Sequence, residues 1–394
     1  MSILFYDDSP VFGGHEVMTL LGLKALLKAH PGQVRFISST ANSKLRENLS
    51  SIAADHPNLA LELVDYHSSR LEALRNLVKP SRIRQLADRL KTLRPSLVVA
   101  VQGNIEHSSL VLHAAADTGM NSCSYIPVPH SNAEMGAKLG SLRDVFCSSL
   151  FRLPGAFITI TDEMANLLRQ RGATAPIHLV YNGVDTVRFQ NGHADEAREQ
   201  LVLPSRKILI GLIGRIEFRQ KQQHLLVNAV ASNTRLASSC HLVFAGDGPD
   251  SENLKERIRQ QGVHGTVLPW CDPALLYRAL DAVVIPSRYE GLPLVMLEAL
   301  ASGITVLGSD RDGMKDLLPS ACRFKPNDVP AITESLVRFV DQGCPPPDPA
   351  LVERVRTTMS LDSFGSSFSR QILCLAGLDG GHSHLQSPPQ PPHT

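Results

Sequence analysis

The amino-acid sequence predicts an α/β protein built of two Rossmann-like, doubly wound domains that face a cleft. Short apolar runs alternate with longer amphipathic stretches along the chain, which is typical of strand–helix units and a parallel sheet. The alternation comes in two separate series, and a chain of 394 residues suffices for two or three domains. Ligands of such sheets bind beyond the carboxyl ends of the strands, so we expect a site in the cleft.

The first series predicts an amino-terminal domain over residues 1–190. It opens with a strand at 2–6, a loop, and a helix from His15 to about His30 whose leucines recur at helical spacing. Further strands are expected at 34–38, 59–64, 97–101, 157–161 and 177–180. The polar stretch that follows, residues 191–206, is interpreted as a linker.

The second series predicts a carboxy-terminal domain over residues 207–361. Its expected strands are 208–214, 241–245, 266–268, 282–286 and 305–308, with a helix at about 293–301. A last helix is expected at 362–378. Residues 379–394 contain Gly-Gly, His and Pro-Pro elements that cannot bury apolar surface, which predicts a disordered tail.

Composition excludes several classes of protein. The 39 Lys and Arg nearly balance the 38 Asp and Glu, whereas dedicated nucleic-acid binders are usually strongly basic, so we expect no nucleic-acid partner. None of the seven cysteines forms a C-x-x-C pair, which argues against a disulfide framework or zinc site. No apolar run approaches the roughly 20 residues that span a bilayer, and the start lacks a basic signal region. We therefore expect a cytoplasmic protein.

Residues 286–303 are the most informative segment. They predict a strand, a tight turn at Gly291, Pro293 near the first helical turn and then an apolar helix. The free N–H groups at such a helix start bind anions. Glu290 in the turn and Glu298 about two helical turns on could accept hydrogen bonds from sugar or ribose hydroxyls. The alternative is a solvated turn residue and a charge on the helix face.

This segment resembles the E-x7-E motif of retaining glycosyltransferases of the GT-B fold, family 4, also called glycosyl transferases group 1. Four other segments match the family's motifs in order: Gly13-Gly14-His15-Glu16 (G-G-x-E), Tyr181 to Asp185 (N-G-V-D), Gly214-Arg215 to Lys221 (G-R…K) and Ala245 to Pro249 (G-x-G-P). The match runs along most of residues 1–375 and is more specific in the second half.

The resemblance implies a metal-independent enzyme without a cofactor. It would transfer a hexose-type sugar from a nucleotide-diphosphate sugar to an acceptor hydroxyl with retention of configuration. It also implies that the helix at 362–378 crosses back to the first domain. The donor would contact Gly13, Gly14, Gly214, Arg215, Lys221, Glu290, Gly291, Leu292, Pro293 and Glu298, with Glu298 on the ribose and Glu290 on the hexose.

The expected catalytic residues are His130, Arg215, Lys221 and Glu290. Arg215 and Lys221 follow a strand end, where two cations could neutralise a diphosphate leaving group, although each could also be an ordinary surface cation. His130 follows an apolar run, and the resemblance places it beside the transferred sugar; the alternative is a packed loop histidine. One departure from the family is Gln222, where glycine is more usual after the lysine.

The amino-terminal loop has two interpretations. Gly13 and Gly14 could let the backbone approach a phosphate or sugar closely, or they could form only a turn. His15 and Glu16 would then lie on the acceptor side, or His15 would be a solvated residue at the helix start. The N-G-V-D turn is interpreted as mainly structural, because Asn-Gly commonly shapes turns.

Three further signals suggest other chemistry. Asp310-Arg311-Asp312 spells D-x-D, which elsewhere holds a metal, but its position favours a loop and we expect no metal. Asp7-Asp8 after the first strand suggests a phosphatase nucleophile, yet the later elements of such an enzyme have no counterpart. Residues 70–94 carry eight Lys and Arg against two acids in an amphipathic pattern, which predicts either peripheral membrane contact or a solvated helix face.

Two alternatives to this enzyme remain. One is a non-catalytic relative that binds a nucleotide sugar, or a subunit that supports an active partner. The other, within the same fold, is a phosphorylase-type or sucrose-forming enzyme with a small acceptor.

Overall fold

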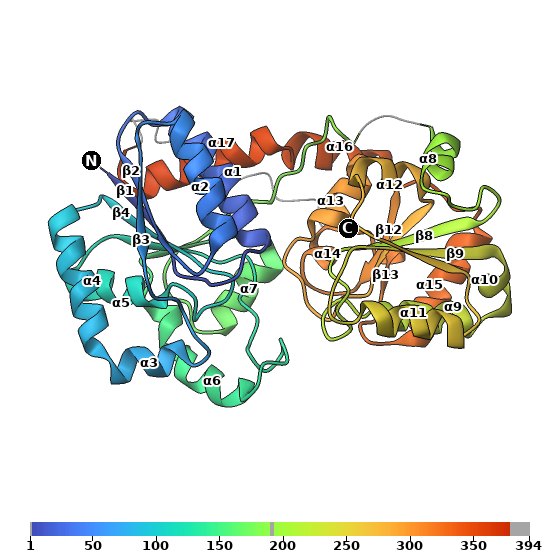
Figure 1. Cartoon of the computed structure of the whole chain (residues 1–394), viewed down its shortest axis with the longest axis horizontal. Helices are drawn as coiled ribbons and strands as arrows, with labels where there is room; N and C mark the ends of the chain where they lie inside the picture. Colours follow the sequence, from blue (N-terminus) through green and yellow to red (C-terminus); the bar gives the residue numbers. More distant parts are fainter. Residues whose placement is uncertain (1, 190–192, 379–394) are drawn as a thin grey trace.

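The computed structural model describes residues 2–189 and 193–378 and contains two parallel β-sheets in separate domains (Figure 1). The first sheet has seven strands in the order β3-β2-β1-β4-β5-β6-β7, and the second has six in the order β10-β9-β8-β11-β12-β13. Every strand pair is parallel. The predicted fold class, two doubly wound α/β domains, is confirmed. The disordered tail predicted at 379–394 lies outside the described residues.

The first domain places short buried strands between helices. Its strands are β1 (Ile3–Asp7), β2 (Val34–Ser39), β3 (Leu59–Val64), β4 (Leu97–Val101), β5 (Ser122–Tyr125), β6 (Ala156–Thr159) and β7 (Ile177–Leu179). Its helices are α1 (Gly14–Ala29), α2 (Ser43–Asp55), α3 (Glu72–Val78), α4 (Pro80–Leu93), α5 (Ser109–Thr118), α6 (Gly140–Cys147), the 3-10 helix η1 (Ser148–Arg152) and α7 (Asp162–Gln170). The central strands β1 and β4 are buried at every residue, as expected for a parallel sheet covered on both faces.

The second domain repeats this arrangement. Its strands are β8 (Ile208–Ile213), β9 (Cys240–Ala245), β10 (Gly265–Leu268), β11 (Ala282–Ile285), β12 (Thr305–Ser309) and β13 (Arg323–Phe324). Its helices are α8 (Ala194–Gln200), α9 (Gln223–Ala231), α10 (Thr234–Ser239), α11 (Ser251–Gln260), α12 (Pro273–Ala279), α13 (Leu294–Ala301), α14 (Asp312–Leu317), the 3-10 helix η2 (Ser320–Cys322), α15 (Val329–Asp341) and α16 (Pro349–Thr358).

The structure corrects the linker predicted over 191–206. Residues Ala194–Gln200 form α8, which packs against α12 in the second domain. Arg198 of this helix is buried, and its guanidinium donates to the Ala279 carbonyl and to Asp281, both at 2.9 Å. The segment has a polar sequence because α8 buries little apolar surface, and this polarity suggested a linker. The buried guanidinium of Arg198 instead attaches the segment to the second domain.

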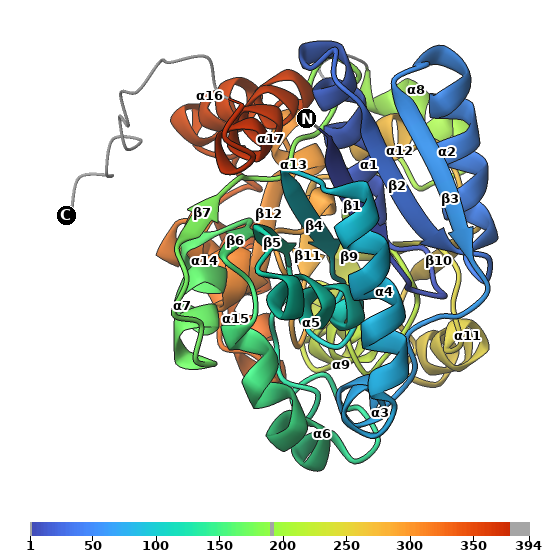
Figure 2. The same ribbon diagram turned by 90° about the vertical axis from the view of Figure 1, so that its left-hand side faces the viewer.

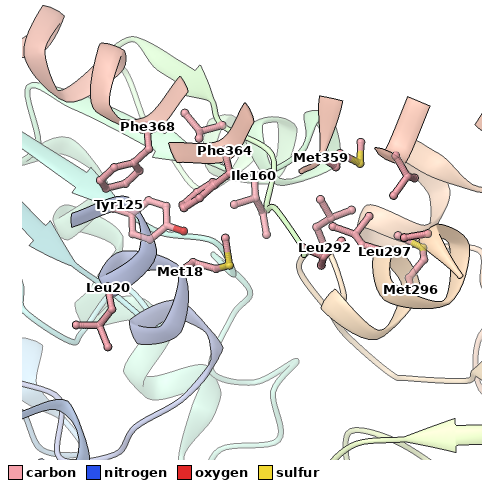
Figure 3. Packing of buried hydrophobic residues seen from close by; sticks show 14 of the residues in the cluster. Met18, Leu20, Tyr125, Ile160, Leu292, Met296, Leu297, Met359, Phe364 and Phe368 are labelled. Carbon is pink, nitrogen blue, oxygen red and sulfur yellow. The ribbon is translucent and has the colours of Figure 1, made fainter. Parts of the chain in front are cut away.

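The last helix, α17 (Leu361–Leu375), packs against α1 of the first domain. The ring centroid of Phe368 lies 6.4 Å from that of Phe5. It lies 5.5 Å from that of Tyr125, and Figure 3 shows these two side chains together. Where the chain returns from the second domain to the first, Val184 and Ser360 form a parallel β-bridge. The polypeptide therefore passes between the domains at two places, and the last helix completes the core of the first domain.

The basic segment 70–94 forms α3 and α4. Ile83, Leu86 and Leu90 on the apolar side of α4 are buried in the first domain. This side of α4 is therefore unavailable to a membrane, whereas peripheral membrane contact through residues 70–94 as a whole stays a prediction. Within the described ranges 2–189 and 193–378, no helix combines the length and the apolarity that crossing a membrane requires.

Candidate functional site

The turn between β11 and α13 lies at the contact between the domains. A Cβ atom on Gly291 would lie 2.7 Å from Ile160 Cδ1 and 3.0 Å from the Pro127 carbonyl, so the first domain approaches this turn too closely for any other residue. Pro293 is the N-cap, and α13 starts one residue later than expected. The N–H groups of Met296 and Leu297 donate to the Pro293 carbonyl at 3.1 and 3.3 Å, so the N–H groups of Leu294 and Val295 are the ones that an anion at this end could bind.

Glu290 and Lys221 come together beside this turn. The Lys221 ammonium lies 2.5 Å from Glu290 Oε1, although 69 residues separate them in the sequence. The Glu290 backbone N–H donates to Asp312 at 2.9 Å. A cation and a carboxylate thus lie next to the start of α13, where they could bind a phosphate and a hydroxyl.

Arg215 is separate from this pair in the structure. Its side chain is 66% exposed, and its Nε lies 3.7 Å from Glu217. The buried amide of Gln223 donates to the Arg215 carbonyl at 2.9 Å and so fixes the loop after β8. Gly214 has a φ of +126°, and a Cβ on Gly246 would overlap its carbonyl, which explains why both predicted loops carry glycine.

Glu298 accepts a hydrogen bond from the Tyr277 hydroxyl at 2.8 Å. Burial raises the pKa of Glu298, and the bond from Tyr277 opposes that rise. Tyr277 lies on α12, and nothing in its sequence context indicated a role at the site. The bond holds one carboxylate oxygen, which leaves the other for a ligand hydroxyl.

His130 is held between the two domains. Its Nδ1 lies 3.0 Å from Glu134, and its Nε2 lies 3.2 Å from the Glu290 carbonyl and 3.3 Å from Asp312. Burial lowers the pKa of His130, but hydrogen bonds with Asp312 and Glu134 outweigh it and raise the pKa to about 9. His130 is therefore charged at neutral pH and cannot act there as a base.

Three residues of this network were missed by sequence reasoning. Glu134 binds both His130 and Arg311, and these cations lower the pKa of Glu134 to about 2. Asp312 accepts a hydrogen bond from the Arg311 guanidinium at 2.9 Å, whereas Asp310 accepts one from Arg323 at 2.6 Å. The two carboxylates of the D-x-D string thus have different partners. The loop interpretation holds for Asp310 and Arg311 only, because Asp312 is the first residue of α14.

The amino-terminal loop forms a helix cap. The Gly13 N–H donates to Glu16 Oε2 at 2.6 Å, and His15 Nδ1 lies 3.0 Å from the same oxygen. Glu16 is fully buried, so the structure gives it a capping role, whereas His15 packs against Gly103 and lies nearer the surface. A Cβ on Gly14 would meet no atom of the described residues within 4 Å, so the backbone there is open to a ligand.

A second cluster lies behind this loop. Asp7, at the end of β1, offers a carboxylate oxygen within 4.8 Å of ligand atoms of His15 and Glu16. Burial raises the pKa of Asp7 to about 8 despite the charge of His15. Within the described part of the chain, these three residues are the group that could hold a metal ion. The expectation that the reaction needs no metal stays a prediction.

Comparison with known proteins identifies the family. Residues 12–188 match the model of glycosyltransferase family 4, and residues 193–348 match that of glycosyl transferases group 1. The chain belongs to the group 1 glycosyltransferases of the GT-B fold. The predicted family is thereby confirmed, whereas retention of configuration stays a prediction.

Several curated relatives are similar over part of the chain. Identity is 29% over 226 residues with the lipopolysaccharide core biosynthesis mannosyltransferase LpsB of Rhizobium meliloti, which covers 51% of this chain and 62% of the relative. It is 27% over 218 residues with the alpha-D-kanosaminyltransferase of Streptomyces kanamyceticus, covering 52% and 54%. The chain thus aligns with less than two thirds of the length of these relatives.

Solved structures share the fold over nearly the whole chain. The lipopolysaccharide outer core galactosyltransferase WaaB matches with a TM-score of 0.70 and 18% identity, over 95% of this chain and 99% of its own. Anabaena Alr3699/HepE, solved in complex with UDP-glucose, matches with a TM-score of 0.72 and 15% identity, over 95% and 100%. These likenesses establish the GT-B architecture.

Proposed function

We propose that this protein is a retaining glycosyltransferase that moves a hexose-type sugar from a nucleotide-diphosphate sugar to an acceptor hydroxyl. One observation carries the proposal: Lys221, Glu290 and the start of α13 lie together at the contact between the domains. A diphosphate needs cations and N–H donors, and a sugar needs carboxylates, so this arrangement suits a sugar diphosphate. The similar proteins LpsB, a mannosyltransferase, and HepE, solved with UDP-glucose, agree with a hexose donor.

In the proposed complex the donor diphosphate lies on the first turn of α13 and against Lys221. Glu298 accepts hydrogen bonds from the ribose, and Glu290 accepts them from the hexose. Arg215, which is exposed and separate from the Lys221–Glu290 pair in the structure, turns toward the diphosphate when the donor binds. The positive groups stabilise the charge that develops on the leaving diphosphate, which is the main source of catalysis we assign to this chain.

The proposed transfer forms the bond between the acceptor oxygen and the anomeric carbon on the face from which the diphosphate departs. The bond between that carbon and the diphosphate oxygen breaks, and the nucleoside diphosphate leaves with the electron pair. Because His130 already carries two protons, we assign the acceptor proton to the departing diphosphate oxygen. We place this reaction in the cytoplasm and without a metal.

Nucleotide-dependent thermal stabilisation tests the donor site. UDP, GDP, ADP and their sugar conjugates are added to wild type, Glu298→Gln and the control Glu252→Gln, whose carboxylate is 85% exposed on α11. A ligand at about 100 times its dissociation constant stabilises a protein by about 2.7 kcal/mol. We expect one nucleotide to raise the melting temperature of wild type and of the control, and to have a smaller effect on Glu298→Gln.

Turnover tests the chemistry. With the donor identified, we expect Lys221→Gln to lower kcat/KM by about 100-fold, the usual effect of losing one group that stabilises a developing oxyanion. NMR of the product would show whether the anomeric configuration is retained, and added EDTA should leave the rate unchanged. Binding without turnover on a broad acceptor panel would instead favour the non-catalytic relative.

A further inference from the structure

Three polar side chains meet at the carboxyl end of β1, behind the amino-terminal loop. They are Asp7, the last residue of β1, and His15 and Glu16 in the first turn of α1. One ligand atom of each lies within 4.8 Å of those of the other two. Opposite ligands of a metal ion bound at about 2.1 Å are roughly 4.2 Å apart, so small movements of these side chains would suffice to coordinate an ion. We call these three residues the β1/α1 cluster.

Each residue of the cluster has a buried polar atom without a hydrogen-bond partner among the described residues. These atoms are Asp7 Oδ2, His15 Nε2 and Glu16 Oε1. Asp7 and Glu16 are fully buried, and the His15 side chain is 13% exposed. Because an unpaired buried polar atom costs free energy, nearly all such atoms in proteins have a partner. Three of them on neighbouring side chains indicate one ligand that all three share.

The remaining polar atoms of the cluster are held in place by hydrogen bonds. Asp7 Oδ1 accepts one from the Ser9 N–H at 2.9 Å. Glu16 Oε2 accepts one from the Gly13 N–H at 2.6 Å and lies 3.0 Å from His15 Nδ1. A hydrogen bond from Nδ1 to this carboxylate leaves Nε2 as the nitrogen with a free electron pair. Side chains that bind metals are oriented in this way, each by a hydrogen bond to an atom that does not bind the ion.

The fold brings the cluster together from separate segments of the chain. β1 lies between β2 and β4 in the first sheet (Figure 2). His15 packs against Gly103, two residues after the end of β4, where a Cβ atom would lie 2.5 Å from the imidazole Cε1. Glycine at position 103 therefore makes room for the imidazole next to the end of β1.

The two carboxylates of the cluster lack a strong counter-ion. Within residues 2–189 and 193–378, Glu16 contacts the His15 imidazole, and neither Asp7 nor Glu16 pairs with a lysine or an arginine. Buried carboxylates need a cation beside them, and a divalent ion matches the charge of two. A buried water molecule could satisfy the same atoms but would not balance this charge.

We propose that the β1/α1 cluster binds one divalent transition-metal ion. Two carboxylates and an imidazole suit Mn²⁺, Co²⁺ or Zn²⁺, whereas Ca²⁺ requires six to eight oxygen ligands. The ion joins the end of β1 to the first turn of α1 and so stabilises the loop between them. It takes no part in the proposed transfer reaction, because Glu16 caps α1 through its other oxygen with or without the ion.

Isothermal titration calorimetry of the full chain, freed of metal with EDTA and dialysed, tests the proposal. We expect one Mn²⁺ to bind per chain with a dissociation constant below about 1 mM, and Ca²⁺ to bind at least about tenfold more weakly. Asp7→Asn keeps the acceptor for the Ser9 N–H but loses the charge, and should bind Mn²⁺ at least about 100-fold more weakly. His15→Gln should bind it at least about tenfold more weakly.

The matched control is Asp8→Asn, the same substitution one residue further on. Both oxygens of Asp8 already accept hydrogen bonds, Oδ1 from the Ser108 N–H at 2.8 Å and Oδ2 from the Tyr6 hydroxyl at 3.2 Å. Asp8→Asn should therefore bind Mn²⁺ like wild type. Urea unfolding without metal checks that each variant is folded, and His15→Gln, altered nearer the surface, decides the test if Asp7→Asn does not fold.

Three results would overturn the proposal. The first is a wild type that binds no Mn²⁺ at about 1 mM, which would assign the cluster to a buried water molecule. The second is binding that neither Asp7→Asn nor His15→Gln weakens, which would place the ion elsewhere. The third is an equal loss in Asp8→Asn. A nucleotide-induced thermal shift that persists in EDTA would show that this site and the donor site are separate.

Discussion

His130 is a charged side chain held between carboxylates of different domains, Glu134 of the first and Asp312 of the second. Its pKa of about 9 lies above the value of about 6.5 in an unfolded chain. The stabilisation that results is complete below pH 6.5 and is lost as the pH rises through 9. The contact between the domains is therefore strongest at neutral and mildly acid pH.

This gives a measurable pH dependence. We expect the difference in free energy of unfolding between wild type and His130→Gln to shrink between pH 6.5 and 9.5, by at most about 3 kcal/mol, with urea unfolding as the measurement. His178→Gln is the control, because burial lowers the pKa of His178 and its pH dependence lies below this window. A difference between wild type and His130→Gln that stays constant over the window would contradict the assignment of a doubly protonated His130.

Sequence reasoning identified part of the site at this scale. Lys221 and Glu290 belong to recognisable motifs, and the structure brings them into contact. The contact between Glu134 and Arg311 could not be predicted, because 177 residues separate them, Glu134 belongs to no motif and Arg311 lies in the D-x-D string that was interpreted as a loop. Gln222, the departure from the family, has a φ of +55°, a left-handed conformation that glycine adopts most easily and that explains the usual glycine there.

At the scale of elements, α17 and α1 pack closely through two glycines. A Cβ on Gly22 of α1 would lie 2.5 Å from the ring of Phe368, and one on Gly365 of α17 would lie 2.8 Å from Ala25. Two glycines, one on each helix, thus face side chains of the partner helix. The close approach lets Phe368 reach the rings of Phe5 and Tyr125 beneath.

Gly22→Ala should therefore destabilise the protein, although alanine favours a free helix by about 1 kcal/mol over glycine. We expect a loss of about 1–3 kcal/mol in the free energy of unfolding from overpacking, measured by urea denaturation. The double variant Gly22→Ala/Phe368→Leu should lose less than the sum of its two single variants, because the ring that the new methyl group meets is gone. Strict additivity would show that the two positions do not touch.

Three of the elements that sequence reasoning missed, β5, β13 and α8, are short or polar. β13 has two residues, and β5 (Ser122–Tyr125) contains two serines, so neither forms an apolar run. α8 has one buried apolar residue, Ala197, and is attached by Arg198 instead. Hydrophobic periodicity in a sequence indicates elements that bury apolar side chains. These three elements were not detected because they depend on strand pairing or on a buried cation instead.

At the scale of the whole molecule, several polar contacts hold the two domains together. Glu134 binds Arg311, the Asn182 amide donates to the Leu292 carbonyl at 3.0 Å, and Lys315 lies 2.8 Å from Glu163. One cluster of buried apolar residues continues from Ile160 of the first domain to Leu292 of the second (Figure 3). The described conformation is therefore closed around the candidate site.

Removing the Glu134–Arg311 ion pair and removing the Lys315–Glu163 ion pair should affect domain closure and activity differently. Glu134→Gln removes a carboxylate shared by two cations, so we expect a larger radius of gyration in small-angle X-ray scattering and a kcat/KM about tenfold lower, which corresponds to about 1.4 kcal/mol. Lys315→Gln removes a pair whose lysine is 48% exposed, and exposed pairs contribute little. It should leave both quantities near wild type. Equal effects of the two substitutions would contradict a special role for Glu134.

The position of α17 also has a consequence for synthesis. The ribosome synthesises the second domain before it synthesises α17, the helix that covers α1. The first domain therefore leaves the ribosomal exit tunnel with the apolar side that α17 later covers still exposed. Domains made first usually fold first. In this protein Phe5 and Tyr125 cannot pack against Phe368 until the ribosome has added more than 240 residues after Tyr125. The first domain is therefore the first to be synthesised and the last to complete its core.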